Sequence, residues 1–422
     1  MADLIEGTPE SVGLSSEGLA QVDAYVQEQI DAGTIPGAIT LVARHGKIVH
    51  VNPMGFKDIA SGEKSRVDGL YRIFSMTKPV TAVAMMILYD EGHWQPDDAV
   101  AKHLPELARL KVFSGKADDG SMIVAEPDHP PTLIELFTHT AGFSYGTALS
   151  DPNDAIDTAY RAANVWGAED LTDMMARLAT TPLAFQPGTS WRYSIGMDVQ
   201  GAIIERLTGQ SLATFMRTRI FEPLGMVDTA FYTPPEKKDR LATLYLKAGD
   251  APLTPIDNPL RKDCDAEPAL ATGGGGLVST IADYARFAQM LVNKGELDGS
   301  RILSADAATL MMTNHLPDAL IQHGFTGGHQ RIRPGFGFGF NGIVFYDPEA
   351  AGIPVGKGTY HWDGAAGTWF WVDPANDLLF VGMTQFLSYT APPLQATTQR
   401  LLADAIMPRG SIALDADTRS VG

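Results

Sequence analysis

The segment that decides the fold runs from Ser75 to Tyr89 and reads SMTKPVTAVAMMILY. The residues after Pro79 are almost all apolar, and a helix that is apolar on most of its faces is a buried one. Proline fits only within the first turn of a helix, so Pro79 sets the start of this helix near Ser75. We therefore expect a buried helix whose N-terminus carries Ser75 and, one turn further on, Lys78.

A serine and a lysine at this spacing can act as a nucleophile and its base, because both side chains point into the same cleft. The lysine can accept the serine proton only if burial or cationic neighbours lower its pKa from ~10.4 toward neutrality. Free backbone N–H groups and the positive end of the helix dipole near Ser75 favour an oxyanion and disfavour a protonated lysine. The segment thus predicts a nucleophilic Ser75 activated by Lys78.

A second pair, Ser61 and Lys64, has the same spacing and serves as an internal comparison. Gly62 and the charges around it, with no apolar run after them, are typical of a surface turn. Spacing alone therefore does not predict a nucleophile. The apolar context distinguishes Ser75 from Ser61.

Length and composition indicate an ordinary soluble globular protein with a large core and two lobes. It has 422 residues, of which 45% are hydrophobic and 19% are charged. The formal charge of -18 would repel nucleic acid and anionic membranes over most of the surface, so neither is an expected partner. The oligomeric state is not specified by these features.

Cys264 is the only cysteine, so no internal disulfide can form and no oxidising compartment is required. It lies in a polar stretch without the histidine neighbours of a thiol nucleophile or a metal site, and we expect no metal or cofactor. The segment from Met1 to Gly7 does not resemble a secretory signal, and no segment approaches the ~20 apolar residues of a membrane span. The expected location is cytoplasmic.

Patterns at both ends of the chain predict one α/β domain. Ser15 or Ser16 can cap a helix that runs to about Gln29, and residues 37–51 form a predicted hairpin around His45 and Gly46. Further strands are expected within four segments, and a final helix at 394–406 can pack on the sheet beside the first helix. The four segments are 335–340, 358–364, 367–372 and 378–383.

The middle of the chain carries helical patterns with little strand signal, so we predict a mainly helical domain at 91–270 inserted between α/β parts at 1–90 and 271–422. The run from Gly273 to Gly276 leads into a predicted capped helix from Ser279 to Leu291. This run lacks the residues of a phosphate-binding loop, and close backbone approach is its expected role.

Several motifs in order make the chain similar to the serine hydrolases of the class C β-lactamase and penicillin-binding-protein superfamily, most closely the family VIII carboxylesterases. The resemblance extends from about residue 10 to residue 405. It implies the β-lactamase/transpeptidase-like fold, an antiparallel sheet flanked by helices with a mainly helical second lobe. The motifs are Ser75–Pro79, Leu136–Gly142, Tyr193-Ser194 with Asp198 and Gly201, Phe221–Met226 and Gly274–Thr280.

The resemblance assigns a second catalytic element to Tyr193. A phenolate, or a phenol that shares a proton with Lys78, can accept the proton of Ser75 and later pass it to the leaving alcohol. Ile195 stands where β-lactamases commonly have asparagine, so an amide contact to substrate is not expected.

The third element of the family is Lys-Thr-Gly in lactamases and Trp-Gly-Gly in esterases, and Trp362-Asp363-Gly364 occupies its place. Tryptophan cannot form the charge-assisted contact that lysine makes with a carboxylate, so neutral esters are the expected substrates. Asp363 departs from the esterase pattern and disfavours anionic substrates further. The N–H groups of Ser75 and Ala365 are the implied oxyanion hole.

Aromatic residues supply candidates for an acyl or alcohol pocket. The expected substrate-binding residues are Trp362, Asp363, Gly364, Tyr145 and Phe143. Trp191, Phe336, Phe338 and Trp369 are further aromatic candidates, of which most are expected to fill the core. His139 and His361 are expected to be structural.

The leading hypothesis is a metal-free serine carboxylesterase that acts on small neutral esters through an acyl-enzyme. A β-lactamase, a D-amino-acid peptidase and an acyltransferase could use the same Ser75, Lys78 and Tyr193. A binding protein with an inactive hydrolase fold is the non-enzymatic alternative, and an intact site argues against it.

Overall fold

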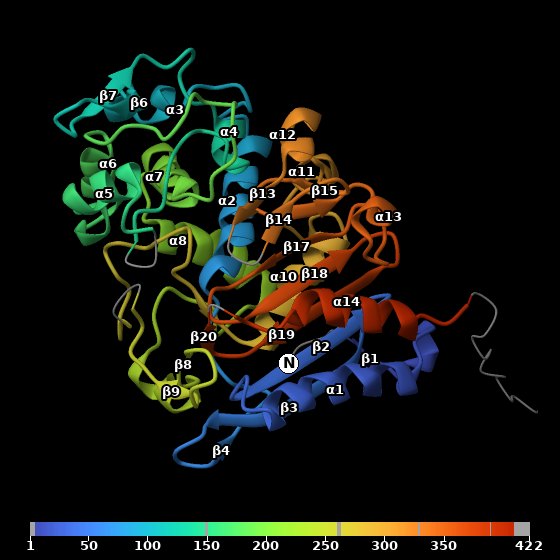
Figure 1. The fold of residues 1–422 in the computed structure, drawn as a ribbon. Helices are drawn as coiled ribbons and strands as arrows, with labels where there is room; N and C mark the ends of the chain where they lie inside the picture. Colours follow the sequence, from blue (N-terminus) through green and yellow to red (C-terminus); the bar gives the residue numbers. More distant parts are fainter. Residues whose placement is uncertain (1–4, 148–150, 260–262, 328–329, 389, 409–422) are drawn as a thin grey trace, which may run out of the picture.

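The computed structural model describes residues 5–147, 151–259, 263–327, 330–388 and 390–408. Part of the N-terminal segment considered for a signal, residues 1–4, lies outside this range. The main sheet has the strand order β1-β3-β2-β19-β18-β17-β16-β15, and β4 pairs with β3 (Figure 1). Its strands are β1 Ile5–Glu6, β2 Gly37–Arg44, β3 Lys47–Asp58, β4 Glu63–Lys64, β15 Phe336–Phe338, β16 Ile343–Phe345, β17 Tyr360–Asp363, β18 Trp369–Asp373 and β19 Leu378–Met383.

The sheet joins the two ends of the chain, as predicted. Strand β2 pairs antiparallel with β19, and β19, β18 and β17 are successive antiparallel neighbours. The β2–β3 hairpin turns at His45 and Gly46, which have φ values of 53° and 71°. Two consecutive residues with positive φ match the twist of a tight hairpin. This predicted turn is confirmed.

Both faces of the sheet are buried, and alternate residues along each strand point to different layers. In β2, Ile39 and Leu41 belong to the core shared with the helical lobe, whereas Ala38 and Val42 belong to the core under the terminal helices. The terminal helices are α1 (Ser16–Asp31), which Ser15 caps, and α14 (Leu394–Ala405). A side chain at Gly18 would collide with Ala405 at 2.5 Å, so α1 and α14 pack closely, as expected.

The opposite face is covered by α10 (Ile281–Val292), which packs on β19, β18 and β2. Helix α2 (Thr77–Asp90) is also almost entirely buried and packs mainly against other helices. The predicted start of α2 near Ser75 is confirmed, because a single 3₁₀ turn, Phe74–Met76, leads directly into the helix. Thr280 caps α10. Just before the 3₁₀ turn, Tyr71–Arg72 form the short strand β5, which pairs with β10 (Val278–Ser279).

Residues 91–270 hold most of the remaining helices, which lie beside the sheet in Figure 1. The domain boundaries at these positions remain a prediction. The helices are α3 Val100–His103, α4 Leu133–Phe137, α5 Ala155–Ala162, α6 Leu171–Leu178, α7 Gly196–Thr208, α8 Leu212–Met216 and α9 Glu222–Leu224. Three further helices, α11 Ala305–Met311, α12 Asp318–His323 and α13 Pro348–Ala351, belong to the C-terminal part.

Residues 91–270 contain more strands than the sequence pattern predicted. A hairpin of β6 (Val112–Lys116) and β7 (Met122–Ala125) projects from the lobe, and β8 (Tyr245–Lys247) pairs with β9 (Thr254–Pro255) and β20 (Phe386–Ser388). All four residues of β7 are exposed, so β7 has no buried face that would impose a period-2 pattern. Short strand pairs β11 Glu296–Leu297 with β12 Ser300–Arg301, and β13 Phe325–Gly327 with β14 Gln330–Ile332, complete the set.

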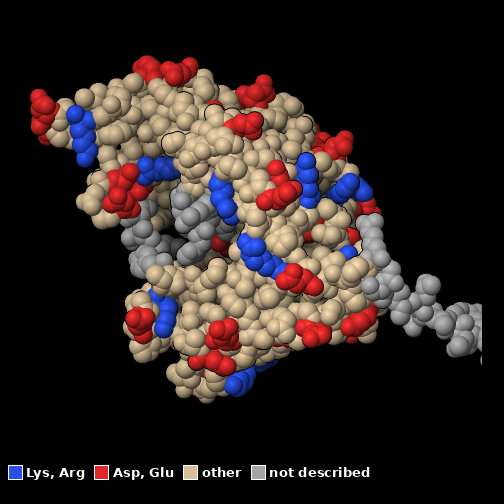
Figure 2. Space-filling view, turned by 45° about the vertical axis from the view of Figure 1, so that its right-hand side comes forward, with Lys and Arg blue, Asp and Glu red and all other residues tan. Residues whose placement is uncertain are grey.

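Acidic and basic side chains are interspersed on the face shown in Figure 2, without a continuous basic patch. Among the helices of the described residues, none is both long enough and apolar enough to cross a lipid bilayer.

Candidate active site

The turn that carries Ser75 is held by residues on both sides. Ile73 N–H donates to Leu277 O at 3.1 Å, and Tyr284 of α10 donates its hydroxyl hydrogen to Met76 O at 2.8 Å. Phe74 has a φ of 43°, in the left-handed region that non-glycine residues seldom adopt. Strained residues of this kind persist where surrounding contacts over-determine the backbone, and they are common at active sites.

Lys78 is fully buried one turn beyond Ser75, and its amine reaches three oxygen atoms. Its Nζ lies 3.2 Å from Ser75 Oγ and 3.3 Å from Tyr145 Oη, and it donates to Gly274 O at 2.5 Å. The contact with Ser75 places the predicted base beside the predicted nucleophile. The contact with Gly274 comes from the four-glycine run.

Burial lowers the pKa of Lys78 to about 7 from its ordinary value of 10.5, although the nearby charges of Asp198 and Asp363 oppose the shift. Asp198, in the first turn of α7, is also fully buried, and burial raises the pKa of its carboxyl while Lys78 opposes that rise. Its Oδ1 accepts the Gly274 N–H at 3.1 Å. Gly274 therefore touches Lys78 through its carbonyl and Asp198 through its amide.

The four-glycine run permits this close packing, as expected. A Cβ atom at Gly274 would lie 2.8 Å from Asp198 Oδ2, and one at Gly273 would lie 2.4 Å from Met197 O. Either substitution would displace its neighbours.

Tyr193 lies in an irregular segment just before α7 and donates its hydroxyl hydrogen to Ser75 Oγ at 2.7 Å. Burial, with smaller contributions from Asp363 and Asp198, raises the pKa of Tyr193 far above its usual range. Of the two forms expected for Tyr193, burial thus favours the neutral phenol over the phenolate.

Four aromatic rings form a column beside Lys78. Tyr145 stacks on Tyr193 with ring centroids 5.3 Å apart, and Trp166 stacks on the other face of Tyr145 at 5.4 Å. Trp362 packs against Tyr193 at 5.8 Å. Since the column holds both tyrosines against the amine, it limits how far their hydroxyl groups can move.

The turn after β17 brings Ala365 to the nucleophile. A Cβ atom at Gly364 would lie 2.4 Å from Ile73 O, and Thr368 Oγ1 donates to the same carbonyl at 3.3 Å. Within the described part of the chain, the amides of Ser75 and Ala365 donate no hydrogen bond. Because Ser75 and Ala365 line one cavity, their amides remain the candidates for the predicted oxyanion hole.

A cavity of about 230 Å³ opens at Ser75. None of the described residues that line it carries a charged side chain at neutral pH. They are Phe74, Ser75, Tyr145, Thr147, Trp166, Cys264, Pro268, Leu270, Thr272, Gly274, Gly275 and Ala365.

The wall that carries Cys264 is anchored to β5. Arg72 donates from Nε to Asp263 Oδ1 at 2.9 Å and from Nη1 to Ala242 O at 2.8 Å. Because Arg72 is three residues before the nucleophile, this pair ties the wall to the catalytic turn. Cys264 itself is one of the residues that line the cavity, which its polar sequence neighbours did not predict.

The predicted pocket residues are distributed differently. Tyr145 lines the cavity, whereas Phe143 is 1% exposed and belongs to the core, and Trp362 is buried behind Tyr193. Asp363 and Gly364 line a second cavity of about 240 Å³, and Ala365 lines both cavities.

The other residues singled out in the sequence have structural surroundings. His139 Nδ1 accepts the Ser194 N–H at 3.1 Å, and burial holds its pKa well below the usual range. Burial lowers the pKa of His361 to about 3, and Gln395 contacts its ring. Trp191, Phe336, Phe338 and Trp369 are buried, as is Ile195.

Sequence reasoning did not assign roles to Asp198 and Trp166. Asp198 was part of a quoted motif, and an acidic residue in the apolar first turn of a helix was a usable signal. No local pattern marks Trp166, because its role depends on stacking with Tyr145.

Comparison with known proteins gives a consistent result. The sequence profile of the family described as Beta-lactamase matches residues 22–405. "Protein Rv1367c" of Mycobacterium tuberculosis is 38% identical over 367 residues, covering 86% of this chain and 88% of that protein. "Esterase EstB" of Burkholderia gladioli is 31% identical over 397 residues, covering 89% and 93%.

Among solved structures, "EstCE1, a hydrolase with promiscuous acyltransferase activity" superposes with a TM-score of 0.74 at 27% identity, covering 93% of this chain and 99% of that one. The agreement extends over both the sheet and the helical lobe.

Proposed function

The chain belongs to the beta-lactamase family, and one of its relatives is described as an esterase; on that premise we propose that it is a carboxylesterase of the family VIII kind. It cleaves esters of small neutral substrates through an acyl-enzyme on Ser75. The observation that carries the proposal is the position of Ser75 Oγ. It lies between the amine of a buried Lys78 and the phenol of Tyr193, at the wall of an uncharged cavity.

A neutral Lys78 amine can make all three of its contacts with oxygen atoms. Its two N–H groups can donate to Gly274 O and Tyr145 Oη, which leaves the lone pair for the Ser75 hydroxyl hydrogen. Tyr193 donates to the same Ser75 oxygen. In this arrangement Ser75 can transfer its proton to Lys78 as its oxygen attacks.

In the acylation step, Ser75 Oγ forms a bond to the ester carbonyl carbon while its proton moves to Lys78 Nζ. The carbonyl oxygen becomes an oxyanion that accepts the Ser75 and Ala365 N–H groups. When the intermediate collapses, the bond to the alcohol oxygen breaks. Tyr193 donates its proton to that oxygen and receives one from Lys78, which restores the neutral amine and phenol.

Water completes the cycle. Lys78 takes a proton from the water as its oxygen attacks the acyl carbon, and the same two amides stabilise the second oxyanion. The bond to Ser75 Oγ then breaks, and Lys78 returns the proton to Ser75. The acid leaves and the site is restored.

The preference for neutral substrates follows from charge. The described cavity wall supplies no cation to pair with a carboxylate, and Asp363 and Asp198 both contribute negative potential at Lys78. Burying an unpaired carboxylate here would cost free energy.

The test compares substrates on one preparation. Values of kcat/KM are measured for p-nitrophenyl butyrate, the cephalosporin nitrocefin and a D-alanyl peptide, with Ser75→Ala as the blank. We expect the ester to be the best substrate by a wide margin. A lactam or peptide value equal to the ester value would overturn the esterase assignment, and no Ser75-dependent turnover of any of them would favour a binding protein.

Acyl transfer is a second candidate, because EstCE1 is described as having promiscuous acyltransferase activity and the second cavity offers space beside Ala365 for an acceptor. Added butanol then competes with water for the acyl-enzyme. Butyl ester formed at the expense of butyrate, at constant release of p-nitrophenol, supports transfer. Butyrate alone as product excludes it for this acceptor.

A further inference from the structure

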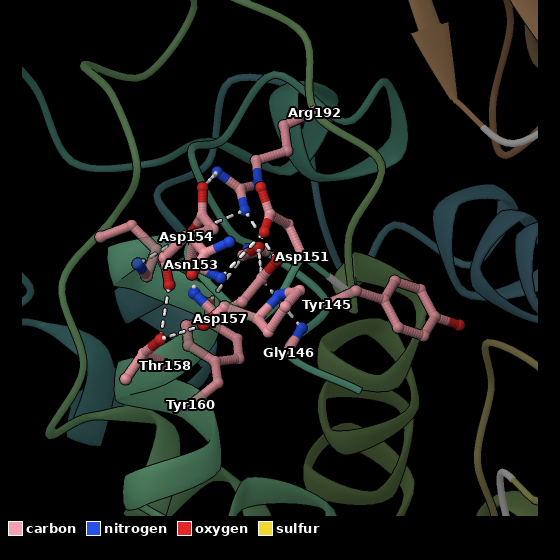
Figure 3. A network of polar contacts seen from close by, with 12 residues as sticks. Tyr145, Gly146, Asp151, Asn153, Asp154, Asp157, Thr158, Tyr160 and Arg192 are labelled. Atoms are coloured by element: carbon pink, nitrogen blue, oxygen red, sulfur yellow. Dashed lines mark hydrogen bonds and ion pairs between the residues drawn. The ribbon is translucent and has the colours of Figure 1, made fainter. Parts of the chain in front are cut away.

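The two tyrosines beside Lys78 stand on irregular segments rather than on helices or strands. Tyr145 lies in the loop after α4, and Tyr193 lies just before α7. Neither position is set by regular backbone hydrogen bonds, so other contacts must hold the hydroxyl groups near Lys78 and Ser75. Figure 3 shows a polar network on the side of these segments away from the Tyr145 ring.

One carboxylate in this network contacts both segments. Asp157 of α5 is 4% exposed, and its Oδ1 accepts hydrogen bonds from the Ser144 hydroxyl and, at 3.1 Å, from the Gly146 N–H. These residues flank Tyr145 on both sides. The other oxygen, Oδ2, lies 3.1 Å from Nη2 of Arg192, the residue before Tyr193.

Arg192 is held in place by a second carboxylate. Its Nη1 donates to Asp154 Oδ2 at 3.1 Å, and its Nη2 lies 3.0 Å from Asp154 Oδ1. Asp154 is the N-cap of α5, where it accepts the N–H groups of Ile156 and Asp157. This fork geometry orients the guanidinium as well as neutralising it.

The loop around Tyr145 also packs tightly on α5. The Ser144 N–H donates to Tyr160 Oη at 3.1 Å. Gly146 has a φ of 62°, and a Cβ atom there would lie 2.3 Å from Tyr160 Cβ. The loop therefore has little freedom to shift along α5.

We propose that Asp157 and Arg192 are positioning residues that set Tyr145 and Tyr193 against each other and against Lys78. This inference rests on the proposed function. Neither side chain lines the cavity, so both act through the tyrosines. The Ile195 N–H donates to Ser144 O at 3.0 Å, so the Tyr145 and Tyr193 segments are also joined directly. The Asp157–Arg192 network then sets how the two segments are aligned.

The expected effect is on the rate of acyl transfer. A misplacement of about 1 Å at a reacting group can cost up to about 10²-fold in rate. We expect Arg192→Gln and Asp157→Asn each to lower kcat for p-nitrophenyl butyrate by roughly 10-fold or more, with a smaller change in KM. Arg192→Lys, which keeps the charge and loses the fork, should recover part of the loss.

A double-variant comparison separates positioning from general damage. In the Tyr193→Phe background, Arg192→Gln should cost less than about 3-fold in kcat, because the hydroxyl of the adjacent Tyr193, which Arg192 positions most directly, is already absent. Arg240→Gln is the matched control, since Arg240 also forms a forked pair with a carboxylate, Asp228, at 3.0 and 2.6 Å. It should leave kcat within about 2-fold of the wild type.

Each outcome decides the question. Equal losses from Arg192→Gln in both backgrounds, or wild-type kcat in all the Arg192 and Asp157 variants, would overturn the inference. If Arg192→Gln does not fold, as judged by thermal unfolding, Arg192→Lys in the two backgrounds is compared in its place. Tyr193→Phe with wild-type kcat would overturn the inference too, whereas absence of Ser75-dependent turnover in the wild type would overturn the proposed function itself.

Discussion

Two serine–lysine pairs in this chain share one spacing and differ in everything around it. Ser75 and Lys78 stand at the start of a buried helix, and the lysine amine contacts three oxygen atoms. Ser61 lies in an exposed turn and Lys64 in the short strand β4 that follows it, where the Lys64 amine sits 3.7 Å from the ring centroid of Phe56. The first lysine faces its serine, and the second faces an aromatic ring near solvent.

The difference shows that the chemistry resides in the environment rather than in the motif. Burial removes water from the Lys78 amine, which disfavours its charged form and makes it a base near neutral pH. The exposed Lys64 amine keeps its access to water and meets an aromatic ring in place of a serine hydroxyl. Four experiments test how much each part of this environment contributes to the catalytic rate and its pH dependence.

The largest expected effect is on the nucleophile itself. Ser75→Ala should lower ester hydrolysis by at least about 10³-fold, because a serine nucleophile has no substitute in the site. Ser61→Ala should leave the rate unchanged. A fluorophosphonate adduct mapped by mass spectrometry should fall on Ser75 alone, and modification of Ser61 would contradict the comparison.

The second effect concerns the base and its partner. Lys78→Ala and Tyr193→Phe should each lower kcat by about 10²–10⁴-fold, the usual contribution of general acid–base groups. Their losses should not multiply in the double variant, because both serve one proton transfer. Lys64→Ala is the matched control and should keep wild-type kcat. Fully multiplicative losses would mean that the two residues act independently.

The third effect tests the glycine that joins Lys78 to Asp198. Gly274→Ala would place a Cβ atom 2.8 Å from Asp198 Oδ2 and displace the carbonyl that Lys78 contacts. We expect roughly a 10-fold loss of kcat. Gly275→Ala is the matched control, since Gly275 lines the same cavity and its Cβ atom would meet no atom of a non-adjacent residue closer than Phe74 at 3.8 Å. Equal rates for the two variants would argue against a role for the Gly274 contact.

The smallest effect is a shift in pH dependence. Lys78 acts as a base only when neutral, so kcat/KM should fall as the pH drops through about 7. The negative charges of Asp198 and Asp363 raise the pKa of Lys78, in that order of size. Removing a negative charge lowers this pKa, so the acidic limb should move to lower pH in Asp198→Asn and less far in Asp363→Asn. A shift to higher pH would be inconsistent with Lys78 as the titrating base.

Local patterns in the sequence predicted the elements whose causes are local. Ser15 as a cap, Gly46 in the hairpin turn and Pro79 in the first turn of α2 act through the backbone of neighbouring residues. The β6–β7 hairpin was missed because its second strand buries no face, and burial is what produces the alternation that marks a strand.

The sequence by itself determined the helix that carries Ser75 and Lys78, the use of both chain ends in one sheet, and the superfamily resemblance that pointed to Tyr193. Only the tertiary structure decided that Asp198 and Tyr145 lie near Lys78, that Trp166 stacks on Tyr145, that Phe143 lies in the core, and that Cys264 lines the cavity. Helix and turn preferences depend on neighbouring residues and can be read locally. Contacts between distant segments depend on how whole faces pack, and the pKa of Lys78 depends on the burial that this packing creates.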